Sequence, residues 1–417
     1  MFKRFIAAAL LALAFALPCA AGADLADTLL RGKFWELSGN EFRVLFNGAR
    51  ASAVDDDTLR ILKGSGISFG GLRLGEILLY RGEDGGFSRL DAVIYSKGDN
   101  GELGRENFEM LLEESVAAID TAARVAGTPF QTGKRDTGVK TRAWKWETPN
   151  CFIRLEASSS GRGGAYTAEF IRVSFGPSEE ALERGGASDG VRRRDLKDNV
   201  RTDGDGNVWL EGIPMVDQGD KGYCVPATVS RVFAYYGMDG VDQHALAALC
   251  KSSAEKGTAT SAMAEALSEI GRAFRVRVVE LDPNGIKNFI LEYNKTAKKM
   301  RRTTVTGTDM SKMTFEPDIA LEAHAGKTVQ VRKWLAAVKK NIDAGVPVLW
   351  CVRLGIFPEI SARQSQGGHL RLIIGYNETA GTVIYSDSWG AHHARKEMPL
   401  KQACAITVLR YVLRPTR

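Results

Sequence analysis

The chain has 417 residues, of which 44% are hydrophobic, and its formal net charge at pH 7 is +6. This length exceeds the needs of one modest domain, and the apolar content is sufficient for two cores. A net charge of +6 does not indicate a nucleic-acid partner. The basic cluster from Lys295 to Arg302 does not indicate one either, because no stacking aromatic residues interleave it beyond the nearby Tyr293. That cluster is typical of a solvated helix face.

The first 23 residues have the pattern of a signal peptide. A basic start is followed by the apolar run Phe5–Leu17, which is short for a membrane span, and then by small residues that allow cleavage near Ala21 or Ala23. No later run approaches a membrane span, so stable membrane insertion is not expected. We expect export to the periplasm or the extracellular space. Lipoprotein anchoring through Cys19 is not expected, because Pro18 occupies a position where a small residue is needed.

Residues 24–176 predict a small α+β domain. Strand patterns cover residues 76–80, 90–95, 141–147, 151–155 and 166–174, and apolar residues three and four apart predict a helix over 106–125. The domain has no recognisable chemical motif, so its function is not readable. Residues 177–207 are charged and glycine-rich, which predicts a linker before a second domain over 208–417.

Cys224 precedes a run with helical spacing of apolar residues that Gly237 ends. The thiol is therefore expected at a helix N-terminus, where unpaired N–H groups and the helix dipole lower a thiol pKa. Gln218 lies six positions earlier, across a loop with glycines at 219 and 222. Its amide can join the backbone N–H of Cys224 as a donor to an oxyanion.

His369 follows two glycines and opens an apolar strand that ends at Tyr376, and a second strand over 382–386 leads to Asp387. The turn between them predicts a hairpin, which brings Asp387 close to His369. A carboxylate there would hold the imidazole in place as the base that activates the thiol. Trp389 would shield this pair from water.

The segment from about Val208 to Arg417 resembles a papain-like cysteine peptidase of the bacteriocin-processing, double-glycine type. Its Asp-Ser-Trp-Gly at 387–390 is similar to the Asn-Ser-Trp-Gly of papain. The resemblance implies an α+β papain-like fold with two lobes and a cleft for an extended peptide or protein substrate. It also implies site roles: Cys224 as nucleophile, His369 as base, Asp387 as the residue that orients the base, and Gln218 as oxyanion donor.

Three functions are compatible with these residues. The first is a secreted cysteine peptidase that hydrolyses peptide bonds, and the second is a transglutaminase-like acyltransferase or amidase that forms the same thioester. The third is a non-catalytic binding protein with a papain-like shell. None of them requires a cofactor or a metal, and His392 with His393 has no neighbouring ligand set in the sequence. The oligomeric state is not readable.

Five cysteines remain after cleavage, and this odd number fits one reactive thiol together with as many as two disulfides. The alternative is that the other four are buried thiols, because Cys351 lies in a strand-like apolar segment. The sequence does not decide between the two.

Overall fold

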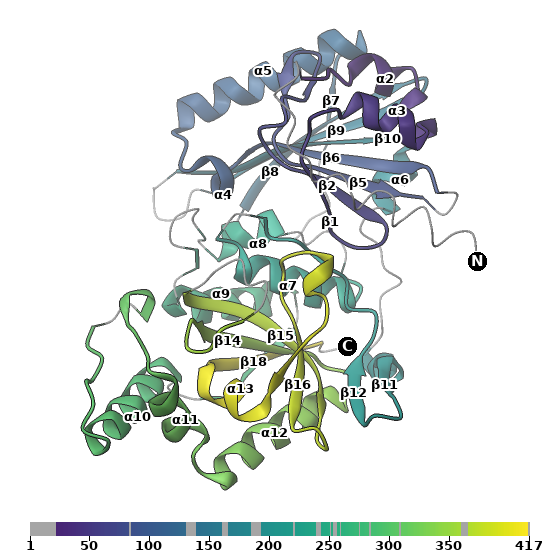
Figure 1. Cartoon of the computed structure of the whole chain (residues 1–417). Coiled ribbons are helices and arrows are strands. Elements are labelled where there is room, and N and C mark those ends of the chain that lie inside the picture. The colour runs from purple at the N-terminus through teal and green to yellow at the C-terminus, as the bar shows by residue number, and fades with distance from the viewer. Residues whose placement is uncertain are drawn as a thin grey trace. The chain divides into compact units, whose positions relative to one another are not determined.

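The fold was analysed in a computed structural model (Figure 1). It describes residues 22–82, 85–130, 139–160, 166–184, 193–219, 222–238, 243–250, 252, 257–258, 260–274, 276–282, 285–307, 310–359 and 366–415. The predicted signal segment up to residue 21, with Cys19, lies outside the described residues.

The chain divides into two compact units. The first comprises Met1–Ala187, Asp220–Tyr223 and His244–Gly257, and the second comprises Ser188–Gly219, Cys224–Gln243 and Thr258–Arg417. The stretch expected to be a linker contains three regular elements among its described residues, namely α6 (Glu179–Arg184), η3 (Arg193–Asn199) and β11 (Val200–Thr202).

The first unit is built on an antiparallel sheet that has eight strands among the described residues, in the order β1-β2-β5-β6-β10-β9-β8-β7. These strands are β1 (Ala51–Ala53), β2 (Thr58–Ile61), β5 (Ile77–Arg81), β6 (Phe87–Ser96), β7 (Thr128–Phe130), β8 (Val139–Thr148), β9 (Cys151–Ser160) and β10 (Thr167–Gly176). A separate pair is formed by β3 (Ser68–Phe69) and β4 (Leu72–Arg73). The five strands predicted from sequence correspond to β5, β6, β8, β9 and β10.

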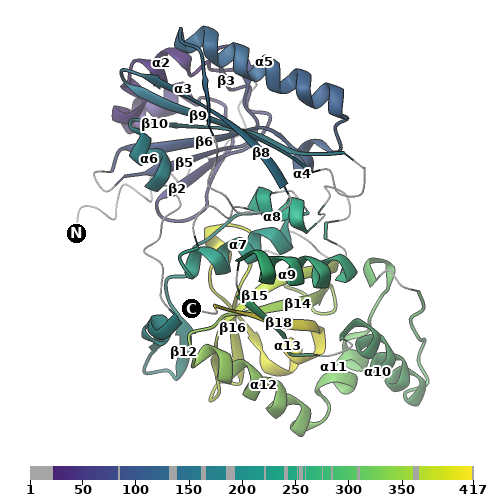
Figure 2. The same cartoon turned by 180° about the vertical axis from the view of Figure 1, so that it is seen from behind.

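Helices cover this sheet in both ribbon views (Figures 1 and 2). They are α2 (Ala26–Leu30), η1 (Lys33–Glu36), α3 (Gly39–Leu45), α4 (Lys97–Asn100) and α5 (Arg105–Ala123). The longest, α5, is the helix predicted from sequence. It buries Phe108, Leu112, Ser115 and Ile119, a spacing of three and four residues that forms one face of a helix.

The start of the described chain is fixed to the first unit by Asp24. Its carboxylate accepts hydrogen bonds from the N–H groups of Ala26, Gly70 and Gly71 and from the hydroxyl of Ser68, all at 2.9 to 3.0 Å. Burial would raise the pKa of this carboxyl, but the backbone and hydroxyl donors outweigh burial and lower it.

The second unit is built on an antiparallel sheet in the order β11-β12-β15-β14-β18-β13, and β16 pairs with both β15 and β17. Its further strands are β12 (Asn207–Leu210), β13 (Val276–Glu280), β14 (Val348–Leu354), β15 (Gly367–Asn377), β16 (Thr382–Ser386), β17 (Lys396–Pro399) and β18 (Thr407–Pro415). Every residue of β14 is buried, because packed elements cover both faces of this part of the sheet.

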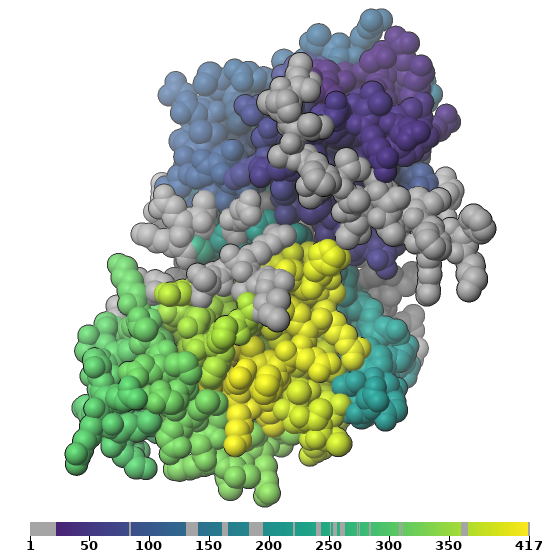
Figure 3. Space-filling model, in the orientation of Figure 1, coloured from purple at the N-terminus to yellow at the C-terminus, as the bar shows by residue number. Residues whose placement is uncertain are grey.

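The second unit also contains helices α7 (Cys224–Tyr235), α9 (Thr260–Phe274), α10 (Gly285–Lys299), α11 (Pro317–Ala325), α12 (Thr328–Ile342) and α13 (Leu400–Ile406), with short η4 (Met310–Lys312) and η5 (Ala391–His393). Most of α8 (Gln243–Leu249) belongs to the first unit. On the face of the second unit drawn in Figure 3, yellow residues of the C-terminal segment lie between green and teal residues from earlier in the chain.

All five cysteines of the described chain are thiols and none forms a disulfide. Cys224 is partly exposed, whereas Cys151, Cys250, Cys351 and Cys404 are buried. The structure therefore favours buried thiols over the alternative of disulfides. Within the described part of the chain, no helix is both long and apolar enough to cross a membrane.

Candidate active site

Cys224 is the first residue of α7, the position that the sequence predicted. The helix is almost entirely buried and ends before Gly237, whose φ of 64° allows the chain to leave the helix. One turn after the thiol, the Thr228 hydroxyl donates to the Leu370 carbonyl at 3.2 Å. Because Leu370 follows His369, this bond fixes the start of α7 beside the strand that carries the imidazole.

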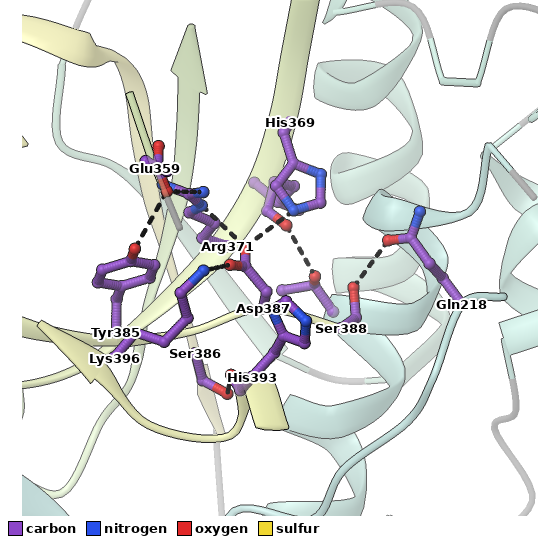
Figure 4. Close-up of polar contacts among 12 residues, drawn as sticks. Gln218, Glu359, His369, Arg371, Tyr385, Ser386, Asp387, Ser388, His393 and Lys396 are labelled. Atoms are coloured by element: carbon purple, nitrogen blue, oxygen red, sulfur yellow. Dashed lines mark hydrogen bonds and ion pairs between the residues drawn. The ribbon is translucent and has the colours of Figure 1, made fainter. Parts of the chain in front are cut away.

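His369 lies near the start of β15 and is paired with Val352 of β14. Strands β15 and β16 form the predicted hairpin, and Asp387 follows directly after β16. His369 Nε2 lies 2.9 Å from Asp387 Oδ1, and both side chains have no exposed surface (Figure 4). The carboxylate thus fixes the orientation of the ring.

The second ring nitrogen, Nδ1, is buried and is not the nitrogen that contacts Asp387. The pKa shifts identify Cys224 as the ionisable group with which the ring interacts. Burial alone would raise the pKa of Cys224, but the interaction with His369 and nearby backbone donors lower it. Burial would lower the pKa of His369, but Asp387 and Cys224 raise it. These opposite shifts favour a thiolate and an imidazolium.

Gln218 is held beside Asp387 by the next residue, Ser388. The Gln218 N–H donates to the Ser388 carbonyl at 2.9 Å, and the Ser388 hydroxyl donates to Gln218 Oε1 at 2.9 Å (Figure 4). Since the amide oxygen accepts from Ser388, the Nε2 group is the part of the amide that can donate hydrogen bonds. Gly219 follows with a φ of 68°, which allows the chain to turn back as the glycine pattern predicted.

Trp389 stacks on His369, with ring centroids 4.3 Å apart and ring planes inclined by 17°. Its side chain is 2% exposed. The indole therefore shields the imidazole from water, as expected from the sequence. It also contacts His393 edge-on at 5.4 Å.

Arginines and a lysine complete the surroundings of Asp387, and sequence reasoning missed them. Arg371 Nε donates to Asp387 Oδ1 at 2.8 Å, and Lys396 Nζ donates to Oδ2 at 3.2 Å. Burial would raise the pKa of Asp387, but Arg371, His369 and Lys396 hold it far below its usual range. The available signal was the spacing of His369 and Arg371, because alternate residues of a strand share one face.

Arg231, two turns after Cys224 on α7, was also missed. Its guanidinium is 1% exposed and donates to the backbone carbonyls of Pro214 and Asp387 at 2.9 and 3.1 Å. It also donates to the Ser386 hydroxyl at 2.6 Å. One side chain thereby connects the helix that carries the thiol to the segment that carries the carboxylate.

The two adjacent histidines belong to no metal-ligand group within the described part of the chain. His393 lies in η5 and its backbone carbonyl accepts from the Asp387 N–H at 3.0 Å. Within the described part of the chain, no group of three or more His, Cys, Asp or Glu side chains is placed to hold a metal ion.

Comparison with known proteins identifies the family of the C-terminal half. Residues 210–413 match the Peptidase_C39 like family, and this part of the chain is a C39-like peptidase domain. A search of curated proteins found no match.

Proposed function

We propose that the protein is a secreted cysteine peptidase that hydrolyses peptide bonds through Cys224, His369 and Asp387, with Gln218 as oxyanion donor. The observation that carries this proposal is the buried contact between His369 and Asp387. The lowered pKa of Cys224 and the raised pKa of His369 support it. A thiol whose pKa is lowered at a helix N-terminus is a better nucleophile at neutral pH.

In the first half of the reaction, the Cys224 thiolate attacks the carbonyl carbon of the scissile bond. The carbonyl oxygen becomes an oxyanion, which the Gln218 amide and the Cys224 N–H stabilise. When the intermediate collapses, the carbon–nitrogen bond breaks and His369 gives its proton to the leaving amine. The acyl group remains on the sulfur as a thioester.

In the second half, the neutral His369 takes a proton from water while the water oxygen attacks the thioester carbonyl. Collapse of this second intermediate breaks the carbon–sulfur bond and releases a carboxylic acid. The sulfur leaves as a thiolate beside the imidazolium, so the starting protonation state is restored. Asp387 keeps the ring oriented through both steps and the imidazolium remains stabilised.

The domain organisation forms part of the proposal. We infer a signal peptide over 1–23, an α+β domain over 24–176, a linker over 177–207 and a papain-like domain with two lobes over 208–417. The antiparallel sheet that carries His369 and the helix α7 that carries Cys224 support this assignment of the C-terminal half.

The direct test is hydrolysis of a random peptide library by the full chain and by Cys224→Ala. We expect the variant to lose hydrolysis and to keep its circular dichroism spectrum, because few atoms are removed at a partly exposed helix end. Cys404→Ala is the matched control, since it makes the same substitution at a buried thiol of the same unit and should remain active.

Three outcomes would contradict the proposal in different ways. Equal hydrolysis by Cys224→Ala would show that Cys224 is not the nucleophile. Products joined to an added amine, in preference to free acids, would identify an acyltransferase. A wild-type chain that binds peptides without cleaving them would identify a binding protein.

A further inference from the structure

We propose that Arg371, held in place by Glu359, is a positioning residue that fixes the orientation and balances the charge of Asp387, and through Asp387 controls the protonation of His369. This inference rests on the proposed function, because it assigns a role within the same site. It concerns groups that contact neither the thiol nor the scissile bond.

The geometry places one carboxylate oxygen between two donors. Asp387 Oδ1 lies 2.9 Å from His369 Nε2 and 2.8 Å from Arg371 Nε. The other edge of the guanidinium donates to both oxygens of Glu359, at 3.1 and 2.6 Å (Figure 4). Because carboxylates occupy two edges of a planar donor group, the guanidinium has little freedom to rotate.

The sheet explains why these groups meet. His369 and Arg371 are alternate residues of β15, so their side chains leave the same face of the sheet. The Arg371 guanidinium packs over the Tyr385 ring at 4.7 Å from its centroid and over Trp350 at 5.9 Å. The Tyr385 hydroxyl donates to Glu359 at 3.1 Å, so the ring that supports Arg371 also fixes its partner.

The charges of this cluster cancel formally. Asp387 and Glu359 contribute two negative charges, and Arg371 and Lys396 contribute two positive charges. Asp387 is therefore kept ionised and oriented by the buried Arg371 and the partly buried Lys396, and these cations compensate much of its charge. Its main effect on His369 is then that of an oriented hydrogen-bond acceptor.

The remaining titratable or charged neighbours lie on other elements. Cys224 interacts with the His369 ring from α7, and the Arg231 guanidinium, also from α7, donates to the Asp387 carbonyl. His393 contributes its backbone carbonyl to the Asp387 N–H, and Cys351 of β14 interacts electrostatically with Cys224. The hydrogen bonds of the Arg371 guanidinium go to Asp387 and Glu359. Substitution of Arg371, Glu359 or Lys396 by an uncharged residue therefore removes one charge from the cluster.

This charge balance predicts the direction in which each substitution shifts the pKa values of the Cys224–His369 pair. Loss of a positive charge lets neighbouring groups hold protons more tightly, so Arg371→Met and Lys396→Met should raise both pKa values of the Cys224–His369 pair. Loss of a negative charge does the opposite, so Glu359→Gln should lower both pKa values. We expect shifts of about one unit, the size typical of a single nearby charge.

The measurement is the rate of Cys224 alkylation by iodoacetamide in the full chain as a function of pH, followed by mass mapping. Two steps in this rate report the formation of the thiolate and the loss of the imidazolium proton, and no substrate is required. Burial raises the pKa of Cys151, Cys351 and Cys404 to about 12, so these thiols should label slowly.

Arg410→Met is the matched control. Arg410 also forms a bidentate pair with a carboxylate, Asp282, at 2.8 Å and packs over an indole, Trp334, at 4.6 Å. It has no hydrogen bond to Asp387, so its loss should leave both steps in place even if the protein becomes less stable. Arg371→Lys should keep both steps close to wild type but lower kcat for peptide hydrolysis, because lysine cannot fork between two carboxylates.

Opposite shifts in Arg371→Met and Glu359→Gln would support the inference. Unchanged steps, or shifts of the same sign, would overturn it while leaving the proposed function intact. If Arg371→Met does not fold, Lys396→Met and Glu359→Gln decide the question in the same way. A wild-type chain with a single step near the ordinary thiol pKa of about 8.5 would instead overturn the proposed function.

Discussion

Asp387 and Ser388 are neighbours in sequence, yet their side chains contact different parts of the site. The carboxylate contacts His369, and the hydroxyl contacts the Gln218 amide. The position of Gln218, the proposed oxyanion donor, therefore depends on the neighbouring Ser388 side chain. The effect of losing the Ser388 hydroxyl can be measured separately from the effect of losing the Gln218 amide.

Ser388→Ala should lower kcat more than it changes KM, because the Gln218 amide loses the contact that fixes its direction. The loss should be smaller than the roughly 10²- to 10³-fold reduction expected for Gln218→Ala. Steady-state kinetics of both variants and of the double variant provide the check. If the two effects were to multiply in the double variant, Ser388 would have a role independent of Gln218.

At this scale, the four candidate site residues could be proposed from the sequence because each has a local signature. Cys224 opens a helical run, His369 follows two glycines, Asp387 ends a strand, and Gln218 precedes the thiol across a glycine loop. Arg371 and Lys396 have no such signature, since a charged residue in a strand is ordinarily solvated. Their role depends on the pairing of β15, β16 and β17, which only the fold specifies.

At the scale of elements, α7 and the β15–β16 hairpin must be held in a fixed position relative to each other. The Arg231 guanidinium contributes to this through its bonds to Pro214, Ser386 and Asp387. Burial lowers the pKa of Arg231 to about 10, so the charge remains in place at neutral pH. The two carbonyls would lose a buried donor if this side chain were shortened to an apolar one.

We expect Arg231→Met to reduce the free energy of unfolding by roughly 1–3 kcal/mol, the usual cost of leaving buried polar groups unsatisfied. Peptide hydrolysis should fall as well, because the thiol and the carboxylate are no longer connected. Urea denaturation gives the stability, and Arg332→Met, on the exposed side of α12, is the control with little expected change. A stable but inactive Arg231→Met would separate the positioning role from the structural one.

In the first unit, the longer elements were predicted and the shorter ones were not. The five predicted strands and helix α5 have clear periodicity, and the basic cluster was rightly interpreted as a solvated face, because Lys295, Lys298 and Lys299 of α10 are exposed. Strands β1 to β4 and the elements within 177–207 are only two to seven residues long. Such short segments are stabilised by their neighbours in space, and periodicity needs a longer run to be detected.

At the scale of the whole molecule, the start of the mature chain is open to test. The Ala23 carbonyl accepts from the Ser68 N–H at 2.9 Å, and the Leu25 N–H donates to the Ser68 carbonyl at 2.8 Å. Cleavage after Ala23 would remove the Ala23 carbonyl with the released peptide, so the first of these bonds would be lost. Cleavage after Ala21 keeps both bonds. For the proposed export with cleavage, we therefore expect N-terminal sequencing of the mature chain to begin at Gly22.

An N-terminus at Asp24 would show that the Ala23 bond is dispensable, and retention of Met1 would contradict export with cleavage. The domain boundaries proposed from composition stay a prediction. The membership of residues 220–223 and 244–257 in the first compact unit could not be predicted, because spatial clustering does not follow chain order.

The tripeptide Asp387-Ser388-Trp389 has a mechanical consequence. It supplies a carboxylate and an indole to His369 and a hydroxyl to Gln218. When this short segment is displaced by thermal motion, all three supports shift together, so His369 and Gln218 keep their mutual spacing. Because Thr228 and Arg231 also tie α7 to this assembly, such a displacement carries the helix that bears Cys224 with it.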